Sequence, residues 1–420
     1  MSAAFVVVVG VLGAVIGSFA NVVIYRLPRS ESIVFPGSHC PHCGHRLSVL
    51  ELVPILSFVA LRGRCHACKA PIGWRYPLVE AVTAALFVAV ALRWPPVVYG
   101  ASLLPLLVVL AMLVMAAVID LDHFTLPDAL TLPALALAVA GSLLYQPLSG
   151  LPSPPHALAG AAVGAGVLLL INRLGALVLR RFADTRERLW PLSLDQANLA
   201  VLGGALGGWR IGLAVGAASV LLNLVTRRTL RLPEGPLYGL WAVALVLSTT
   251  SFTVSTAASV GGSVIAGGTF ALVGAFYWWL HDALTGENAS AQDGAAEQSS
   301  AGAEQGPAGA EQTSTGAEQG SAGADSPKAV VQPDPGDDEP VAMGFGDVKL
   351  AAVLGALLGW QAFLVALLLA VVSGAIGGIA ARAAGGDRVV PFGPALVLGA
   401  VLALFFGHAI LSWYLGLLGA

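Results

Sequence analysis

Two kinds of side chain in this sequence have the types and spacing that chemistry requires: four cysteines and a small set of aspartates. The cysteines form two short motifs, Cys40-Pro-His-Cys43 and Cys65-His-Ala-Cys68. Two CxxC motifs separated by about twenty residues are typical of a tetrahedral zinc site with thiolate ligands. We therefore expect a structural zinc ion bound by Cys40, Cys43, Cys65 and Cys68. Four histidines nearby leave an exchange of ligands open: His39, His42, His45 and His66.

Disulfides and a thioredoxin-like redox pair are the alternatives for these cysteines. The topology argued below places them in the cytoplasm, where thiols are kept reduced. Two CxxC motifs without a βαβ pattern also favour metal over redox chemistry. The metal is expected to fold a small subdomain rather than to catalyse a reaction.

Two aspartates stand at the ends of apolar runs. Asp120 closes the run that ends in Val118-Ile119-Asp120, and Asp347 opens another within Gly344-Phe345-Gly346-Asp347-Val348-Lys349. Ionisable residues in apolar spans are costly and are functional candidates. Two carboxylates that share one water are the machinery of an aspartic peptidase, in which one activates the water and the other polarises the scissile carbonyl. A solvated interfacial residue or a helix cap is the alternative for each.

The helix ends suggest different roles for the two carboxylates. Asp347 is expected at a helix N-terminus, where the dipole favours negative charge, and Asp120 at a C-terminus, where it does not. Asp347 would then begin as the base and Asp120 as the acid, although a coupled pair titrates as a unit.

The elements that must position these residues are membrane helices. Of the 420 residues 57% are hydrophobic and 11% are charged, whereas a soluble domain has roughly 25% charged residues. The composition predicts an all-α polytopic membrane protein of about twelve transmembrane helices, with a small cytoplasmic zinc-binding subdomain. The net charge of −3 gives no reason to expect a nucleic-acid partner. The predicted spans lie near 3–25, 77–93, 97–119, 127–146, 156–179, 197–208, 210–226, 237–254, 262–282, 348–359, 361–381 and 391–416.

The distribution of lysine and arginine orients these spans. With the N-terminus outside, the outside loops receive only Arg93 and Arg210, so the positive-inside rule places 26–76 in the cytoplasm. The inside loops then receive Arg26, Arg29, Arg46, Arg62, Arg64, Lys69, Arg75, Arg180, Arg181, Arg186, Arg188, Arg227, Arg228, Arg231, Arg382 and Arg388. The first apolar run lacks a basic segment before it, which favours a retained helix over a secretory signal peptide. Both aspartates then lie at the cytoplasmic membrane face.

One segment has the composition of a linker. Residues 286–341 repeat GAEQ and are rich in Gly, Ala, Ser, Glu and Gln, which predicts disorder because such a segment buries little apolar surface. The predicted organisation is a first transmembrane helix, a zinc-binding subdomain, transmembrane helices with Asp120, inserted transmembrane helices, this linker and C-terminal transmembrane helices with Asp347. Their ranges are 1–25, 26–76, 77–180, 181–285, 286–341 and 342–420.

The ordered motifs resemble those of the type IV prepilin leader peptidases, membrane aspartic peptidases with a GxGD motif. The resemblance covers roughly 1–180 and 342–420. It is carried by both CxxC motifs, the two aspartate segments, and the stretches Gly17–Pro28, Leu50–Pro54, Arg75–Glu80, Leu358–Trp360 and Pro391–Pro394.

This resemblance implies that Asp120 and Asp347 are catalytic, with Gly344, Gly346, Lys349 and Asp128 as supporting or substrate-binding residues. It implies prepilin or pseudopilin substrates, cut on the cytoplasmic side of the inner membrane just before an apolar helix. It also implies N-methylation of the new N-terminus from S-adenosylmethionine, with 26–76 as the methyltransferase region. Apart from such substrates, the lipid bilayer is the expected partner.

The chain departs from the family by an insertion between the two aspartates. Part of it, Asp195-Gln196-Ala197 through Gly208-Trp209, echoes Gly346-Asp347-Val348 through Gly359-Trp360. The similarity suggests a partial duplication of the GxGD half in which the first copy has lost the motif. Chance similarity between Gly/Ala/Leu-rich helices is the alternative. Asp195 then competes with Asp347 as the partner of Asp120.

Two other functions stay open from the sequence. One is a peptidase without methyltransferase activity, in which the zinc is purely structural. The other is a transporter or a non-enzymatic scaffold, since many transporters combine about a dozen spans with internal repeats. Against a transporter, most spans lack polar residues at their middle, and the acidic pair is predicted at the interface.

Overall fold

A computed structural model describes residues 3–145, 148, 150–179, 191–229, 234–250, 255–285, 344–383 and 391–417. Within these residues the chain is helical, with two isolated β-bridges and no strand. The predicted linker 286–341 lies outside the described residues. The longer helices are α1 (Ala3–Arg26), α3 (Arg75–Arg93), α5 (Leu104–His123), α6 (Asp128–Gly141), α7 (Pro154–Leu179), α8 (Leu194–Thr226), α9 (Glu234–Thr250), α10 (Thr256–Thr285), α12 (Phe345–Leu358), α13 (Trp360–Ala383) and α14 (Phe392–Leu417), and the short ones are α2 (Leu56–Ala60) and α4 (Pro96–Tyr99).

The helices have the length and the surface of membrane spans. Eight of them in the described residues are long and apolar enough to cross a bilayer. Their outer faces carry large apolar side chains, such as Val7, Leu368 and Ile379, which are 62%, 62% and 71% exposed. Water would penalise such a surface and lipid would not. The multi-pass prediction is therefore confirmed, while the count of about twelve spans is not.

One reason for the lower count is α8, which is two segments rather than one straight helix. Gly207 and Gly208 leave the helical conformation, and Gly208 has φ +79°. A Cβ on Gly203 would lie 3.0 Å from the Cβ of Val215, although these residues would be about 18 Å apart on a straight helix. The chain thus folds back at Gly208, as the separate predicted spans 197–208 and 210–226 require.

The same turn recurs between α12 and α13. Gly359 has φ +75°, as Gly208 has +79°, and a tryptophan follows each glycine. The packing partners also correspond. Gly204 lies against Gly262 of α10, and Gly355, its counterpart in the echoed sequence, lies against Gly160 of α7. Glycine at these contacts lets helix backbones approach closely in the absence of a side chain.

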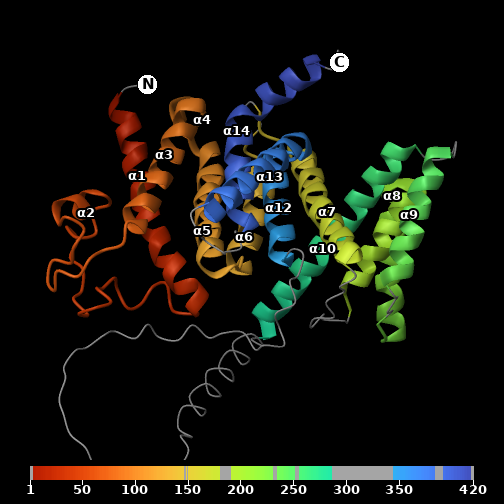
Figure 1. The fold of residues 1–420 in the computed structure, drawn as a ribbon, viewed down its shortest axis with the longest axis horizontal. Coiled ribbons are helices and arrows are strands. Elements are labelled where there is room, and N and C mark those ends of the chain that lie inside the picture. Colours follow the sequence, from red (N-terminus) through yellow and green to blue (C-terminus); the bar gives the residue numbers. More distant parts are fainter. Residues whose placement is uncertain are drawn as a thin grey trace, which may run out of the picture.

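The helices form a row in which α12 lies in the middle (Figure 1). At one end α1 packs on α3 and both contact α5, while at the other end α7 packs on α10, which contacts α8 and α9. Between them α12 contacts α6, α7, α13 and α14, and all of its residues from Leu350 to its end are buried. A short apolar helix enclosed on all sides by other helices is a rigid support for a residue at its first turn.

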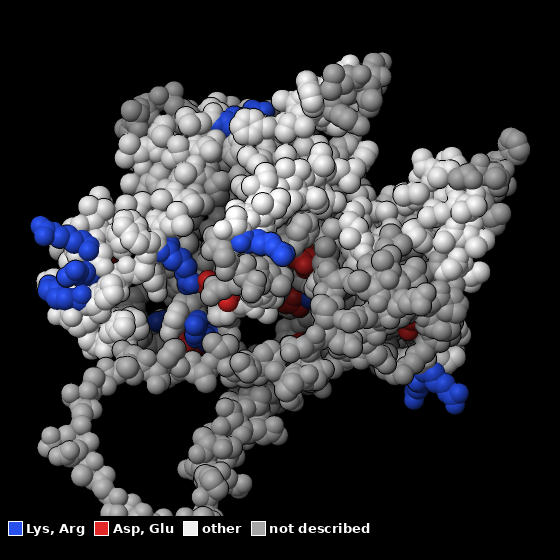
Figure 2. Space-filling model, viewed as in Figure 1, with Lys and Arg blue, Asp and Glu red and all other residues white. Residues whose placement is uncertain are grey.

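On the face that Figure 2 shows, most of the visible lysine and arginine side chains lie in the lower half of the molecule, and acidic side chains gather in its lower middle part. The same half holds the end of α1 and the start of α3 (Figure 1). Arg75 and Arg93 stand at opposite ends of α3. The lower half of this face is therefore the more basic one, in the sense that the positive-inside pattern predicts.

Candidate active site and metal centre

Asp120 lies in the last turn of α5, where it is buried to 5% exposure. Its Oδ2 accepts a hydrogen bond of 3.1 Å from the backbone N–H of Gly393, in the first turn of α14. A Cβ on Gly393 would lie only 2.5 Å from the same oxygen. Gly393 is therefore a site residue that the sequence reasoning did not identify. Gly393 belongs to the Pro391–Pro394 stretch, which the sequence marked, but nothing in the sequence indicated that its N–H would bind Asp120.

Asp347 occupies the third position of α12 and is half-buried. Its carboxylate makes a hydrogen bond with the backbone of Gly344, the N-cap residue, and lies close enough to Asp120 for the two charges to interact. The bond to Gly344 is half of a capping box. The structure thus places the two predicted carboxylates within electrostatic range of each other, on helices that are remote in the sequence.

The supporting residues fix α12 against the loop that follows Asp120. Phe124 takes a left-handed conformation, with φ 54°, and reverses the chain so that α6 begins at Asp128. The Lys349 Nζ donates to both oxygens of Asp128, at 2.6 and 2.7 Å. A Cβ on Gly346 would lie 2.9 Å from the Leu126 Cβ. Asp128, Gly346 and Lys349 therefore lie beside the aspartate pair, and Gly344 caps the helix that carries Asp347.

Asp195 has a different setting at the start of α8. Its neighbour Gln196 stands at the helix position that corresponds to Asp347 and forms a capping box with Ser193. Asp195 itself accepts hydrogen bonds from the Ser193 hydroxyl and donates its N–H to the same side chain. The main neighbours of α8 are α9 and α10, whereas α12 packs against α6, which follows Asp120.

The four cysteines converge in the loop between α1 and α3. Their sulfur atoms all lie within 4.8 Å of one another, and all four thiols are free. In each motif a backbone N–H four residues on donates to the carbonyl of the first cysteine: Gly44 to Cys40 at 2.9 Å and Lys69 to Cys65 at 3.0 Å. Both donors have a left-handed backbone, with φ 69° and 62°.

These two similar turns aim backbone amides at the sulfur atoms. The N–H groups of Cys68 and Ala67 lower the pKa of the Cys65 thiol to about 6, because they stabilise its thiolate. A thiolate is the form that binds metal. Four convergent free thiols fit a structural metal ion, and the disulfide alternative finds no support because the cysteines are unpaired.

Buried polar contacts attach this metal-binding loop to the membrane helices. The Arg26 guanidinium, at the end of α1, donates to the carbonyl oxygens of Ser32 and Pro36 at 2.9 and 2.7 Å. On α3, the Glu80 Oε2 accepts the N–H of Ile55 at 2.7 Å. Arg26 lies in the stretch Gly17–Pro28 and Glu80 in the stretch Arg75–Glu80. Their contacts give these two stretches a structural role that the sequence alone did not indicate.

A pocket of about 420 Å³ lies where this loop region meets the end of α5. Arg75, at the start of α3, forms an ion pair across it with Asp122, two residues beyond Asp120. The pocket therefore joins the segment with the metal-binding loop to the helix with the first aspartate. Its lining consists of Tyr25, Arg29, Arg75, Tyr76, Asp122 and His123.

The fold and the site define the class of the protein. It is a helical membrane protein with an aspartate pair at one end of its bundle and a tetracysteine loop between α1 and α3. Two family models match the chain: the bacterial peptidase A24 N-terminal domain over residues 11–94 and the type IV leader peptidase family over 107–227. The second range contains Asp120 and Asp195 and stops before Asp347.

Named relatives give the same result. A prepilin leader peptidase/N-methyltransferase of Myxococcus xanthus is 42% identical over 211 residues, which are 50% of this chain and 58% of the relative. A type 4 prepilin-like proteins leader peptide-processing enzyme of Escherichia coli is 32% identical over 271 residues, 58% of this chain and 94% of the relative. A prepilin leader peptidase/N-methyltransferase of Pseudomonas putida is 36% identical and covered to 80%. The chain belongs to the type IV leader peptidase family. No solved structure matches it.

Proposed function

We propose that this protein is a membrane aspartic endopeptidase that removes the leader peptides of type IV prepilins or pseudopilins, with Asp120 and Asp347 as its catalytic pair. The observation that carries this assignment is the approach of the two carboxylates from α5 and α12. The names of the relatives supply the substrate class. One carboxylate takes a proton from the attacking water while the other, protonated, donates to the scissile carbonyl.

The division of roles between the two carboxylates cannot rest on helix ends. Asp347 lies at the N-terminus of α12, as expected, but Asp120 accepts an amide from the N-terminus of α14. Both carboxylates thus face the positive end of a helix dipole. The assignment of Asp347 as the initial base loses its support, and we assign the pair a single shared proton instead.

The second activity of the proposal is N-methylation of the new N-terminus. Two of the relatives are named for this activity as well as for cleavage. The pocket at the start of α3 suits S-adenosylmethionine, which supplies an electrophilic methyl group. Arg29 would pair with its carboxylate, and Tyr25 or Tyr76 would stack on its adenine or its cationic sulfonium. The tetracysteine loop, in the segment between α1 and α3, would hold structural zinc.

The proposed location is the inner membrane, with the aspartate pair and the metal-binding loop on the cytoplasmic side. The supporting observation is that most of the basic side chains on the face in Figure 2 lie in its lower half. Lipid would contact the exposed apolar faces, and no nucleic-acid partner is proposed.

The inserted helices raise the question of which aspartate completes the pair. We propose that α8 and the helices around it descend from a duplication of the half that contains α12 and α13, and that the first copy is inactive. In support, the glycine turn and the N-terminal capping position recur in both copies. Since Gln196 occupies the position of Asp347, Asp195 is not expected to take part in catalysis.

The experiment that tests the pair replaces each aspartate by asparagine and measures the cleavage of a prepilin in membrane vesicles. Asp120→Asn and Asp347→Asn each remove a group that must gain or lose a proton, so cleavage should fall about 10²–10⁴-fold. Asp195→Asn is the matched control and should keep the wild-type rate. The opposite pattern, with Asp195 essential and Asp347 dispensable, would move the site into the first copy, and full activity in all three variants would favour a scaffold.

A further inference from the structure

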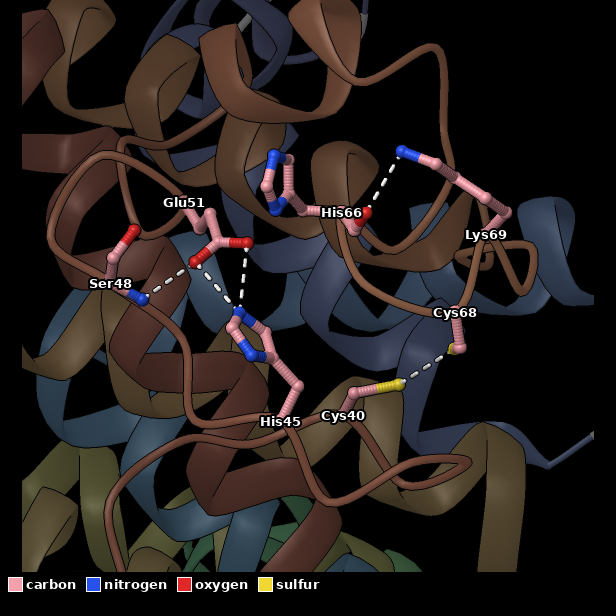
Figure 3. A network of polar contacts seen from close by, with 7 residues as sticks. All are labelled: Cys40, His45, Ser48, Glu51, His66, Cys68 and Lys69. Carbon is pink, nitrogen blue, oxygen red and sulfur yellow. Dashed lines mark hydrogen bonds and ion pairs between the residues drawn. The ribbon is translucent and has the colours of Figure 1, made fainter.

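A second group of metal-binding side chains lies beside the tetracysteine cluster. The imidazoles of His45 and His66 and the carboxylate of Glu51 each offer one ligand atom, and these atoms all lie within 4.8 Å of one another. His45 follows the first CxxC motif by two residues, and His66 lies inside the second. Figure 3 shows the three side chains turned toward a common space, while Cys40 and Cys68 approach each other at a separate place.

Glu51 is held in an orientation that favours a cation. Its Oε2 accepts the backbone N–H of Ser48 at 2.8 Å, which fixes the carboxylate plane. The Nε2 of His45 lies 3.3 Å from each of the two carboxylate oxygens. Oε1 is fully buried and has no hydrogen-bond partner of suitable geometry. A buried carboxylate oxygen without a hydrogen bond is costly, and a bound cation would remove that cost.

An ordinary ion pair between His45 and Glu51 is the simpler explanation of this contact, but it leaves His66 unexplained. The His45 and His66 rings are 6.4 Å apart between centroids and tilted by 39°, so they are not stacked on each other. The nearby lysine does not neutralise the carboxylate, because the Lys69 Nζ donates to the backbone oxygen of His66 at 2.8 Å. Two imidazoles and one carboxylate around a shared space form a common ligand set for divalent zinc.

From this geometry we propose that His45, Glu51 and His66 bind a second divalent metal ion of the zinc class, separate from the ion of the four cysteines. Two imidazole nitrogens and one carboxylate oxygen suit a borderline ion, whereas the cysteine site offers only thiolates. Water would fill the remaining coordination positions. The three ligands come from the first CxxC turn, the loop after it and the second CxxC turn. The ion therefore cross-links the loop around Glu51 to both turns.

The test is the metal content of the full-length protein, purified in detergent and equilibrated with zinc. The wild type should retain two zinc ions per chain by mass spectrometry of the metal. Glu51→Gln and His66→Ala should each retain one. His39→Ala is the matched control, because this exposed histidine has the same chemistry, and its ring Nδ1 lies 3.1 Å from the Gly37 oxygen rather than in the cluster. It should retain both ions.

Cobalt substitution separates loss of the site from loss of the fold. Cobalt bound by thiolates has an intense charge-transfer absorption that a nitrogen and oxygen site lacks. In Glu51→Gln and His66→Ala this absorption should persist while the cobalt content falls by one ion. A single ion in the wild type, or an unchanged content in both variants, would overturn the proposal. Loss of the thiolate absorption together with the ion would also overturn it, because the residues would then serve the cysteine site.

Discussion

Gly393 determines where the Asp120 carboxylate can sit, because its backbone N–H holds Oδ2 and its missing side chain leaves room for that oxygen. A methyl group on Gly393 would displace either the carboxylate or the first turn of α14. Displacement of a reacting group by about 1 Å can reduce a rate about 10²-fold.

We therefore expect Gly393→Ala to lower prepilin cleavage by about 10²-fold without unfolding the protein. Gly377→Ala is the matched control, because a Cβ at this position on α13 would meet nothing within 4 Å. Initial cleavage rates in vesicles with equal amounts of folded protein check this expectation. Equal rates for both variants would mean that Asp120 does not need its contact with α14.

Lys349 and Asp128 act on the pair at a greater distance, by joining the first turn of α12 to the start of α6. If this contact positions Asp347, the effects of Lys349→Met and Asp128→Asn should be non-additive, because either change breaks the same interaction. We expect each single variant to reduce kcat about tenfold with little change in KM, and the double variant to be no slower than the worse single one. Multiplicative losses would show that the two residues act independently.

At the scale of elements, α12 depends on small residues for its approach to α7. Gly355 lies directly against the backbone of Gly160, and Gly204 has the corresponding place between α8 and α10. An added methyl group in such a contact costs about 1–3 kcal/mol through displaced helices. A substitution at Gly355 or at Gly204 therefore disturbs the same kind of helix contact, one in each copy of the helix pair.

Gly355→Ala and Gly204→Ala should both lower the thermal stability, measured in detergent by tryptophan fluorescence. Only Gly355→Ala should also reduce cleavage, because α12 carries Asp347 and α8 does not carry a catalytic residue in our proposal. A loss of cleavage in Gly204→Ala that matched the loss in Gly355→Ala would show that the inserted helices support the active site directly.

The tetracysteine loop is an element whose fold depends on its ion. With few buried apolar side chains of its own, the segment between α1 and α3 is expected to lose its structure when zinc is removed. Trypsin should then cut after Arg62, Arg64 and Lys69, because these exposed side chains lie on a backbone that only the bound ion keeps ordered, and added zinc should restore the protection. Cleavage after Arg227, at the end of α8, is the internal control and should not change. Equal cleavage after Arg62 with and without zinc would contradict a structural role for the metal.

At the scale of the whole molecule, the sequence predicted those features that depend on residue type and order. The spacing of Cys40, Cys43, Cys65 and Cys68 was sufficient for a metal site, and the positions of Asp120 and Asp347 at the ends of apolar runs were sufficient for a hypothesis about catalysis. Charge placement predicted a basic end of the bundle. All of these are local patterns, which a linear chain displays directly.

Features that depend on packing were not predictable in the same way. No pattern indicated that Gly393 would donate to Asp120, since their contact forms only when α14 docks on α5. The prediction from helix ends considered only the C-terminus of α5 for Asp120, whereas the N-terminus of α14 also lies at its carboxylate. The span count was uncertain because runs as short as 197–208 do not reveal whether the chain continues or folds back. The domain boundaries, and Asp347 as the second catalytic residue, remain predictions.

The bond between Lys349 and Asp128 joins residues that are 221 positions apart. Together with the packing of α12 on α6 and α7 and of α14 on α5, it holds the two carboxylates in place through contacts between distant parts of the chain. None of these contacts involves α8, α9 or α10. We therefore infer that the connection between the two parts could lengthen during evolution, by added helices and a long polar stretch, while the chemistry was kept.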